Sequence, residues 1–175
     1  MKNLKTFIFV FVLLTQPLLA NEKSGVFTVD MAKLLRFSEY GKSIIAANNI
    51  ARQNLQNEND NLEDKLLAEE KELSKLRETL SIDEFRPKAL DFDKRVTIIR
   101  EAQSEKEENL IKKNRSEEAE FFKKVYPLLY ELLLERGGSV LFDQRNIILW
   151  DNSIDITDEA IKLINQVFGD GEQTN

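Results

Sequence analysis

The strongest constraint in this sequence is a nearly continuous helical pattern over residues 41–136. After Gly41 no glycine occurs until Gly137, and the stretch contains only two prolines. Because glycine and proline are the residues that most often end helices, the stretch predicts long helices and few turns. A fold back near residues 82–87 gives two antiparallel arms, each about 60 Å long at ~1.5 Å per residue. The sequence therefore predicts an elongated molecule.

Apolar residues in the first arm recur every eleven residues. The two series are Tyr40, Ala51, Leu62, Leu73 and Ile44, Leu55, Leu66. Such a repeat corresponds to ~3.67 residues per turn, so a narrow apolar stripe stays nearly straight along the helix. Folding at the tip then pairs positions whose residue numbers add to about 166. The residues predicted to pack the arms together are Ile44, Leu55, Leu66, Leu73, Phe92, Ile99, Ile111 and Phe122.

The middle of the second arm is poor in apolar residues. In the predicted register, Leu62 meets only Gln103 or Ser104. Thin packing there predicts low local stability and bending. Towards the root the second helix becomes densely apolar, and Pro127 predicts a kink because it lacks the N–H that would bond to the preceding turn. At the tip, Ser81 and Glu84 have the spacing of a capping box for the returning helix.

The segments outside the arms predict a small β body. Residues 25–30 form a strand pattern, followed by a short helix at residues 31–37 that Gly41 ends. Residues 139–142 and 147–150 are typical of a hairpin around residues 143–146, and residues 157–168 of an amphipathic helix capped by Asp155 or Thr157. Residues 170–175 are typical of a frayed tail. The predicted fold class is α+β and mostly α, with a body of residues 21–41 and 137–175 and an arm of residues 42–136.

A body of about 60 residues with open strand edges cannot bury enough apolar surface to hold such arms alone. This predicts oligomerisation through the body. The predicted interface residues are Val26, Phe27, Val29, Leu141 and Ile148.

The first twenty residues have the pattern of a secretion signal. Lys2 and Lys5 form a basic start, an apolar run follows at residues 7–14, and Ala20 marks a cleavage site. Leu18 stands where a smaller residue is usual, which leaves an uncleaved anchor as the alternative. Both interpretations place the chain beyond the inner membrane, in the periplasm.

The composition excludes several classes of function. The chain has no histidine and no cysteine, which removes disulfides, thiol nucleophiles, imidazole bases and the usual zinc ligands. The sequence predicts no cofactor. The net charge of −6 becomes −8 without Lys2 and Lys5, so nucleic acid is a poor partner.

Four carboxylates near the C-terminus, Asp143, Asp151, Asp155 and Asp158, are candidates for a metal or acid–base set. An EF-hand loop starting at Asp151 would place Ile156 at the glycine position and a lysine at the final glutamate position, so the match fails. Turn and helix-cap roles are favoured for all four. Trp150 is predicted to be a core aromatic rather than an exposed contact.

Several local strings resemble one known family. They are Gly-Val-Phe-Thr-Val-Asp at residues 25–30, Tyr-Gly-Lys at 40–42, Gly-Gly-Ser-Val-Leu-Phe-Asp at 137–143 and Asp-Ile-Thr-Asp-Glu at 155–159. In this order they resemble the Skp/OmpH family of periplasmic chaperones. The resemblance implies a homotrimer with a β body and three helical arms around a cavity. It also implies that the cavity holds unfolded outer-membrane β-barrel proteins without ATP.

The charge departs from that resemblance, because the best-known members are strongly basic. Basic residues nevertheless exceed acidic ones around the tip, by eight to six over residues 71–100. A solvated helix face is the plainer interpretation of these residues, and attraction of a client or a membrane surface is the functional one. The residues predicted to act in client capture are Lys88, Lys94, Arg95 and Arg100.

Three functions compete on these observations. The leading one is an ATP-independent holdase, a protein that binds unfolded chains. The second is a coiled-coil spacer or scaffold of the cell envelope, which would need a continuous apolar seam. The third, an enzyme, lacks the residues for most hydrolytic and redox chemistry.

Overall fold

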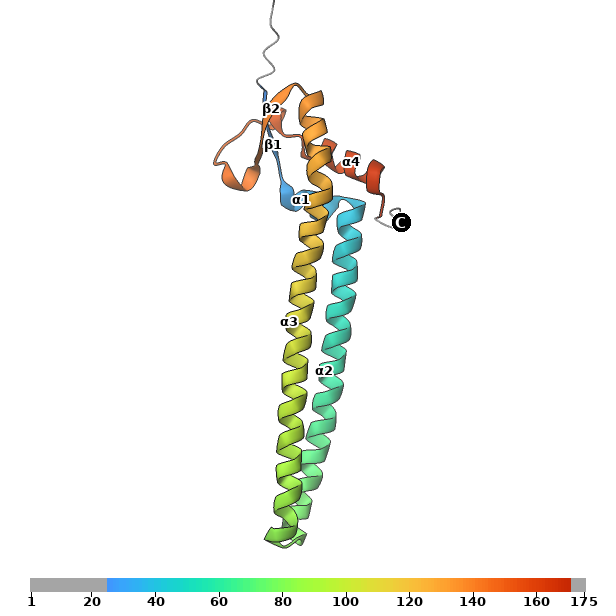
Figure 1. Ribbon diagram of the computed structural model, residues 1–175, viewed down its shortest axis with the longest axis vertical. Helices are drawn as coiled ribbons and strands as arrows, with labels where there is room; N and C mark the ends of the chain where they lie inside the picture. Colours follow the sequence, from blue (N-terminus) through green and yellow to red (C-terminus); the bar gives the residue numbers. More distant parts are fainter. Residues whose placement is uncertain (1–24, 171–175) are drawn as a thin grey trace, which may run out of the picture.

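The structure, a computed structural model, describes residues 25–170. The predicted signal and cleavage site and most of the predicted tail lie outside the described residues. Within them, two long helices form an arm that extends from a small body containing two strands and two shorter helices, as Figure 1 shows. The predicted class, mostly α with a small β part, is confirmed.

The arm consists of α2 (Glu39–Thr79) and α3 (Ile82–Glu135), which run antiparallel from the tip to the body (Figure 1). The 41 residues of α2 correspond to a length of about 60 Å. The capping box predicted at the tip is confirmed, and the N–H of Ser81 donates to Glu84 Oε2 at 3.1 Å. Although Pro87 and Pro127 lie inside α3, the helix continues through both positions. The turn at the tip consists of Leu80 and Ser81, which connect the end of α2 to the start of α3.

The break before the arm helix is at Ser38, so the prediction that Gly41 ends the preceding helix was wrong. Ser38 has an extended backbone, ends α1 (Met31–Phe37), and caps α2 by accepting a hydrogen bond from the Gly41 N–H at 3.1 Å. Gly41 lies inside α2, where a Cβ would be 1.9 Å from the carbonyl oxygen of Leu35. Glycine is thus required for the close approach of α1 to α2 and not for a helix end.

The two strands, β1 (Gly25–Val29) and β2 (Gly138–Asp143), pair in parallel. The predicted hairpin is wrong, because residues 144–146 form a short 3-10 helix, η1 (Gln144–Asn146), and residues 147–150 form no strand. The whole arm is the connection between the strands, and it returns the chain to the same end of the sheet. A parallel pair needs such a long crossover, whereas a tight turn gives only an antiparallel one.

The core of the body lies where the root of α3 packs against the strands, α1 and α4 (Thr157–Phe168). Phe121 and Val125 of α3 are fully buried there, so the body as packed includes the root of the second arm. Tyr40 contacts both Phe121 and Phe168, with ring centroids 5.4 and 5.5 Å apart. These contacts join the roots of both arm helices to the closing helix α4.

A polar network fastens the C-terminal segment to β1. The Ile156 N–H donates to the carbonyl oxygen of Thr28 at 3.0 Å, and the Asp30 N–H donates to Thr157 Oγ1 at 2.9 Å. The buried side chain of Gln144 donates to Thr28 Oγ1 at 3.2 Å. These bonds satisfy polar groups that burial would otherwise leave unpaired.

Candidate functional site

The helices α2 and α3 pack against each other along a seam that follows the arm. Seven of the eight predicted packing residues are buried or half-buried: Ile44, Leu55, Leu66, Leu73, Phe92, Ile99 and Phe122. Ile111 is 45% exposed, so its assignment to the seam was wrong, and Leu110 lies beside Leu55 instead. The cross-arm ion pairs Glu69–Arg95 and Glu58–Lys106 join residues whose numbers add to 164, two less than predicted. The half-buried stripe of α3 runs through Gln103, Leu110 and Asn114, and Ile111 lies off it because it is about 100° around the helix from Leu110.

Polar side chains interrupt this seam at several levels. Five residues of the two arm helices have a buried side-chain oxygen without a hydrogen-bond partner: Asn48, Asn59, Gln103, Asn114 and Glu117. A buried, unpaired polar atom costs about 1–3 kcal/mol relative to a paired one. Asn59 and Gln103 lie in the middle of the arm, and the other three lie nearer the body. The arm is therefore held less firmly over this whole length than at its root, which is packed on the apolar core of the body.

The two sides of the seam differ. Leu66 is in the seam, so Glu69 and Glu70, three and four residues later, project to opposite sides of it. On the Glu69 side, ion pairs from Glu69 to Arg95 and from Glu58 to Lys106 bridge the helices. On the Glu70 side lies an open groove of about 690 Å³. Its apolar lining consists of Leu62, Leu66, Leu67, Phe92, Val96 and Ile99.

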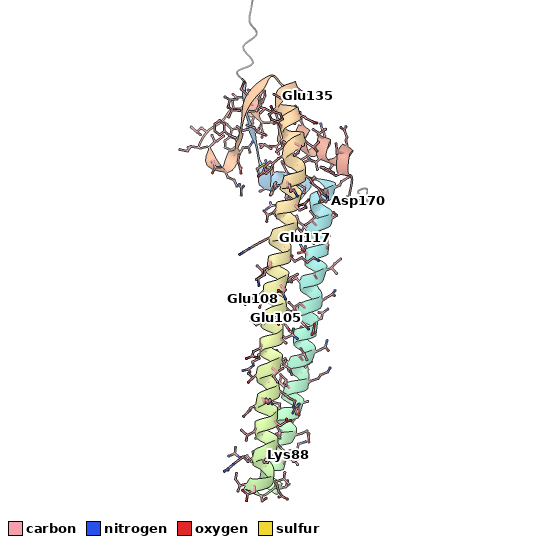
Figure 2. All side chains as sticks on the ribbon, in the orientation of Figure 1. Lys88, Glu105, Glu108, Glu117, Glu135 and Asp170 are labelled. Atoms are coloured by element: carbon pink, nitrogen blue, oxygen red, sulfur yellow. The ribbon has the colours of Figure 1, made fainter. Side chains whose placement is uncertain are left out.

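The four basic residues assigned to client capture near the tip do not share one environment. Figure 2 places Lys88 near the tip, and Lys88 and Lys94 are exposed. Arg95 donates from Nη1 to Glu69 Oε2 at 2.9 Å and from Nε to Asp91 at 3.1 Å. The hydrogen bond from Arg95 lowers the pKa of Glu69 below its ordinary value. Arg95 is therefore a cross-arm link, and Arg100 lies among carboxylates at the groove.

One face of the two-stranded sheet carries exposed apolar side chains. Val26 pairs in register with Val140, Phe142 lies two residues further along β2, and all three are exposed. In the adjoining segment at residues 147–150, Ile148 is 93% exposed and Leu149 is 87% exposed. We call Val26, Val140, Phe142 and residues 147–150 the body patch. Trp150 is 39% exposed, so its predicted core position was wrong: the strand expected to bury it does not form.

Of the five predicted interface residues, only Val26 and Ile148 belong to the body patch. Val29 is 1% exposed because it packs against the chain's own core, so the prediction that a partner chain buries it was wrong. Phe27 and Leu141 are partly buried against the same core. Val140 and Phe142 were missed, although the two-residue alternation of a strand places them on the face opposite Leu141.

The C-terminal carboxylates act mainly as local caps. Asp143 caps η1 and accepts from the Arg145 side chain, which lowers the pKa of Asp143. Asp151 accepts from the Ser153 N–H at 2.8 Å at the start of η2 (Asn152–Ile154), and this bond lowers its pKa. Asp155 accepts from the Thr157 N–H at 2.9 Å, and Asp158 lies in the first turn of α4. Among residues 25–170, no group of three or more acidic side chains could hold a metal ion.

A comparison with protein families decides what kind of chain this is. The family model for outer membrane protein (OmpH-like) matches residues 25–164, which is most of the sequence. The chain belongs to the OmpH-like family. The family resemblance carried by the end strings is thereby confirmed. Members of this family are chaperones and not enzymes, and membership suggests a periplasmic location.

A solved structure supports the same fold. The crystal structure of an OmpH-like protein of Caulobacter crescentus CB15, a candidate outer membrane chaperone, matches with a TM-score of 0.76 at 17% identity. The match covers 87% of this chain and 89% of that one. No match was found among curated protein sequences. Within the described part of the OmpH-like chain, no helix is long and apolar enough to span a membrane.

Proposed function

We propose that this OmpH-like chain is a periplasmic, ATP-independent holdase that binds unfolded outer-membrane β-barrel proteins and prevents their aggregation. The observation that carries the proposal is the arm itself: within residues 25–170, α2 and α3 beyond their root extend from the body and pack only against each other (Figure 1). An arm interrupted by unpaired polar groups can bend around clients of different size. Many weak contacts can then hold an unfolded chain without imposing one conformation on it.

We further propose that the chain works as a homotrimer assembled through the body, with the client in a cavity between three arms. Within residues 25–170 the sheet has only two strands, and parallel sheets are rarely stable unless larger and covered on both faces. The body patch supplies the apolar surface that another copy would cover. The N-terminal signal predicted from sequence would deliver the chain to the periplasm.

The polar interruptions of the seam favour the holdase over a rigid envelope spacer. A spacer must transmit length and force, and a continuous apolar seam serves that role best. In this arm Leu62 lines the groove together with the polar residues Gln103 and Ser104. Gln103 also has a buried oxygen without a hydrogen-bond partner.

Dilution of a urea-unfolded outer-membrane β-barrel protein into buffer without ATP or detergent tests the proposal. The mature chain should suppress light scattering and sediment with the client as a soluble complex. A variant with residues 46–118 deleted and the ends bridged should keep the body but lose this activity. Unchanged aggregation with the full chain, or equal suppression by the armless variant, would contradict the holdase function.

A further inference from the structure

The open groove beside the seam combines an apolar floor with an acidic rim. Leu67 is 55% exposed there, although Leu62, Leu66 and Ile99 around it are half-buried. The carboxylates of the rim are Glu63, Glu70, Asp93 and Glu107, and Arg100 is the one basic residue of the lining. None of these five charged groups forms an ion pair within residues 25–170. The rim therefore has a local net charge of −3 that the chain itself leaves unbalanced.

The groups of the groove that lack a hydrogen-bond partner are oxygen acceptors, as the rim carboxylates are. Asn59 and Gln103 both line it, and each has a buried side-chain oxygen without a partner. The Nε2 of Gln103 is already engaged, because it donates to Glu58 Oε1 at 3.0 Å. Because these two oxygens are buried, the acceptors that a ligand can reach are the exposed carboxylates of the rim, and a complementary ligand must supply donors or positive charge to them.

We propose that this groove binds an extended segment of an unfolded chain in which apolar side chains are interspersed with lysine or arginine. The inference rests on the proposed holdase function and names the kind of segment that the arm selects. A purely apolar ligand would leave the acidic rim unmatched, and a purely basic ligand would leave the apolar floor unmatched. The groove on this acidic chain therefore selects clients by positive charge next to apolar residues.

The dimensions suit such a segment. On α2 the lining runs from Asn59 to Glu70, which is about 16 Å along the helix and equals about five residues of extended chain. A volume of about 690 Å³ is within the usual range for ligand sites. In an extended segment alternate side chains point to opposite sides, so apolar groups can face the floor. Long lysine and arginine side chains can reach back to the rim carboxylates.

The test measures the binding of fluorescein-labelled twelve-residue peptides to the mature chain by fluorescence anisotropy. One peptide repeats Leu-Lys-Leu-Ser, a second has glutamate in place of lysine, and a third has serine in place of leucine. Only the first should bind at low salt. The triple variant Glu63→Gln, Glu70→Gln, Glu107→Gln should bind it about tenfold more weakly, as expected for three partly exposed charge pairs. Leu67→Ser should weaken binding several-fold.

Two matched control variants test whether a loss of peptide binding comes from the groove residues or from a general change in the charge or hydrophobicity of the arm. Asp64→Asn, Glu101→Gln, Glu105→Gln removes the same charge from exposed positions outside the groove, and Figure 2 places Glu105 in the middle of α3. Ile98→Ser removes an aliphatic side chain of similar exposure elsewhere on α3. Both controls should bind the basic peptide as the unmutated chain does, and circular dichroism should show all variants equally helical.

Equal binding of the acidic or serine-rich peptide would overturn the inference, and so would equal loss in the control triple. If the triple variant in the groove lost self-association while the control triple kept it, the groove would be a contact between copies of this chain. That result would also overturn the inference. The unmutated chain and its variants are also tested for suppression of β-barrel aggregation, so that failure of the groove inference can be distinguished from failure of the holdase function. If aggregation is suppressed but groove variants leave peptide binding unchanged, only the groove inference fails. If peptides bind in the groove but no β-barrel client is protected, the holdase function fails.

Discussion

Replacing Gln103 by leucine should make the middle of the arm more rigid. In the structure the buried Oε1 of Gln103 has no partner, and its removal should gain about 1–3 kcal/mol. A half-buried leucine beside Leu62 should add about 1 kcal/mol. The substitution loses the exposed hydrogen bond to Glu58, which is worth about 0.5–1.5 kcal/mol. The net gain of about 2 kcal/mol corresponds to about thirtyfold rarer local opening.

Amide hydrogen exchange, followed by mass spectrometry of peptides covering residues 95–134, measures this opening. In the unmutated chain, exchange at residues 103–108 and 114–118 should be much faster than at residues 125–134. Gln103→Leu should slow it about thirtyfold around position 103. Gln53→Leu is the matched control, because Gln53 is exposed and bonds only to Asn57 on its own helix. Equal slowing in both variants, or none in Gln103→Leu, would refute the account of a seam interrupted by polar groups.

Three further predictions concern the root, the body and the tip. Gly41→Ala should destabilise the chain by about 3 kcal/mol in urea unfolding, because its Cβ would clash with the Leu35 backbone. Gly169→Ala, with a positive φ but no atom within 4 Å, should cost only about 1 kcal/mol. Deleting residues 46–118 should leave the oligomer intact in sedimentation, whereas a folded monomeric body would contradict assembly through the body patch. Changing Lys88 and Lys94 to glutamine should slow client capture about two- to threefold in stopped flow with little effect on dissociation. The same change at Lys42 and Arg52, which lie closer to the body on α2, should leave the capture rate unaltered.

Features encoded by neighbouring residues could be predicted from the sequence. The long arm follows from the absence of glycine between Gly41 and Gly137, and the capping box from the spacing of Ser81 and Glu84. The bounds of α4 were predicted correctly because its amphipathic pattern is strong over twelve residues. The strings near both ends of the chain are specific enough to indicate the OmpH-like family by themselves. Each of these signals lies within one helix, turn or short motif, where local backbone preferences decide the conformation.

Only the tertiary structure decided features that join distant parts of the chain. The sequence pattern of a strand does not show which other strand it pairs with. The parallel pairing of β1 with β2 and the burial of Val29 could therefore be seen only in the packed body. In the arm, the way the two helices pack placed Leu110, and not Ile111, on the seam. The same antiparallel packing joined Arg95 to Glu69 and left the opposite side of the seam as an open acidic groove. Charge and hydrophobicity are properties of residues, but which of them share a surface depends on how the two helices pack.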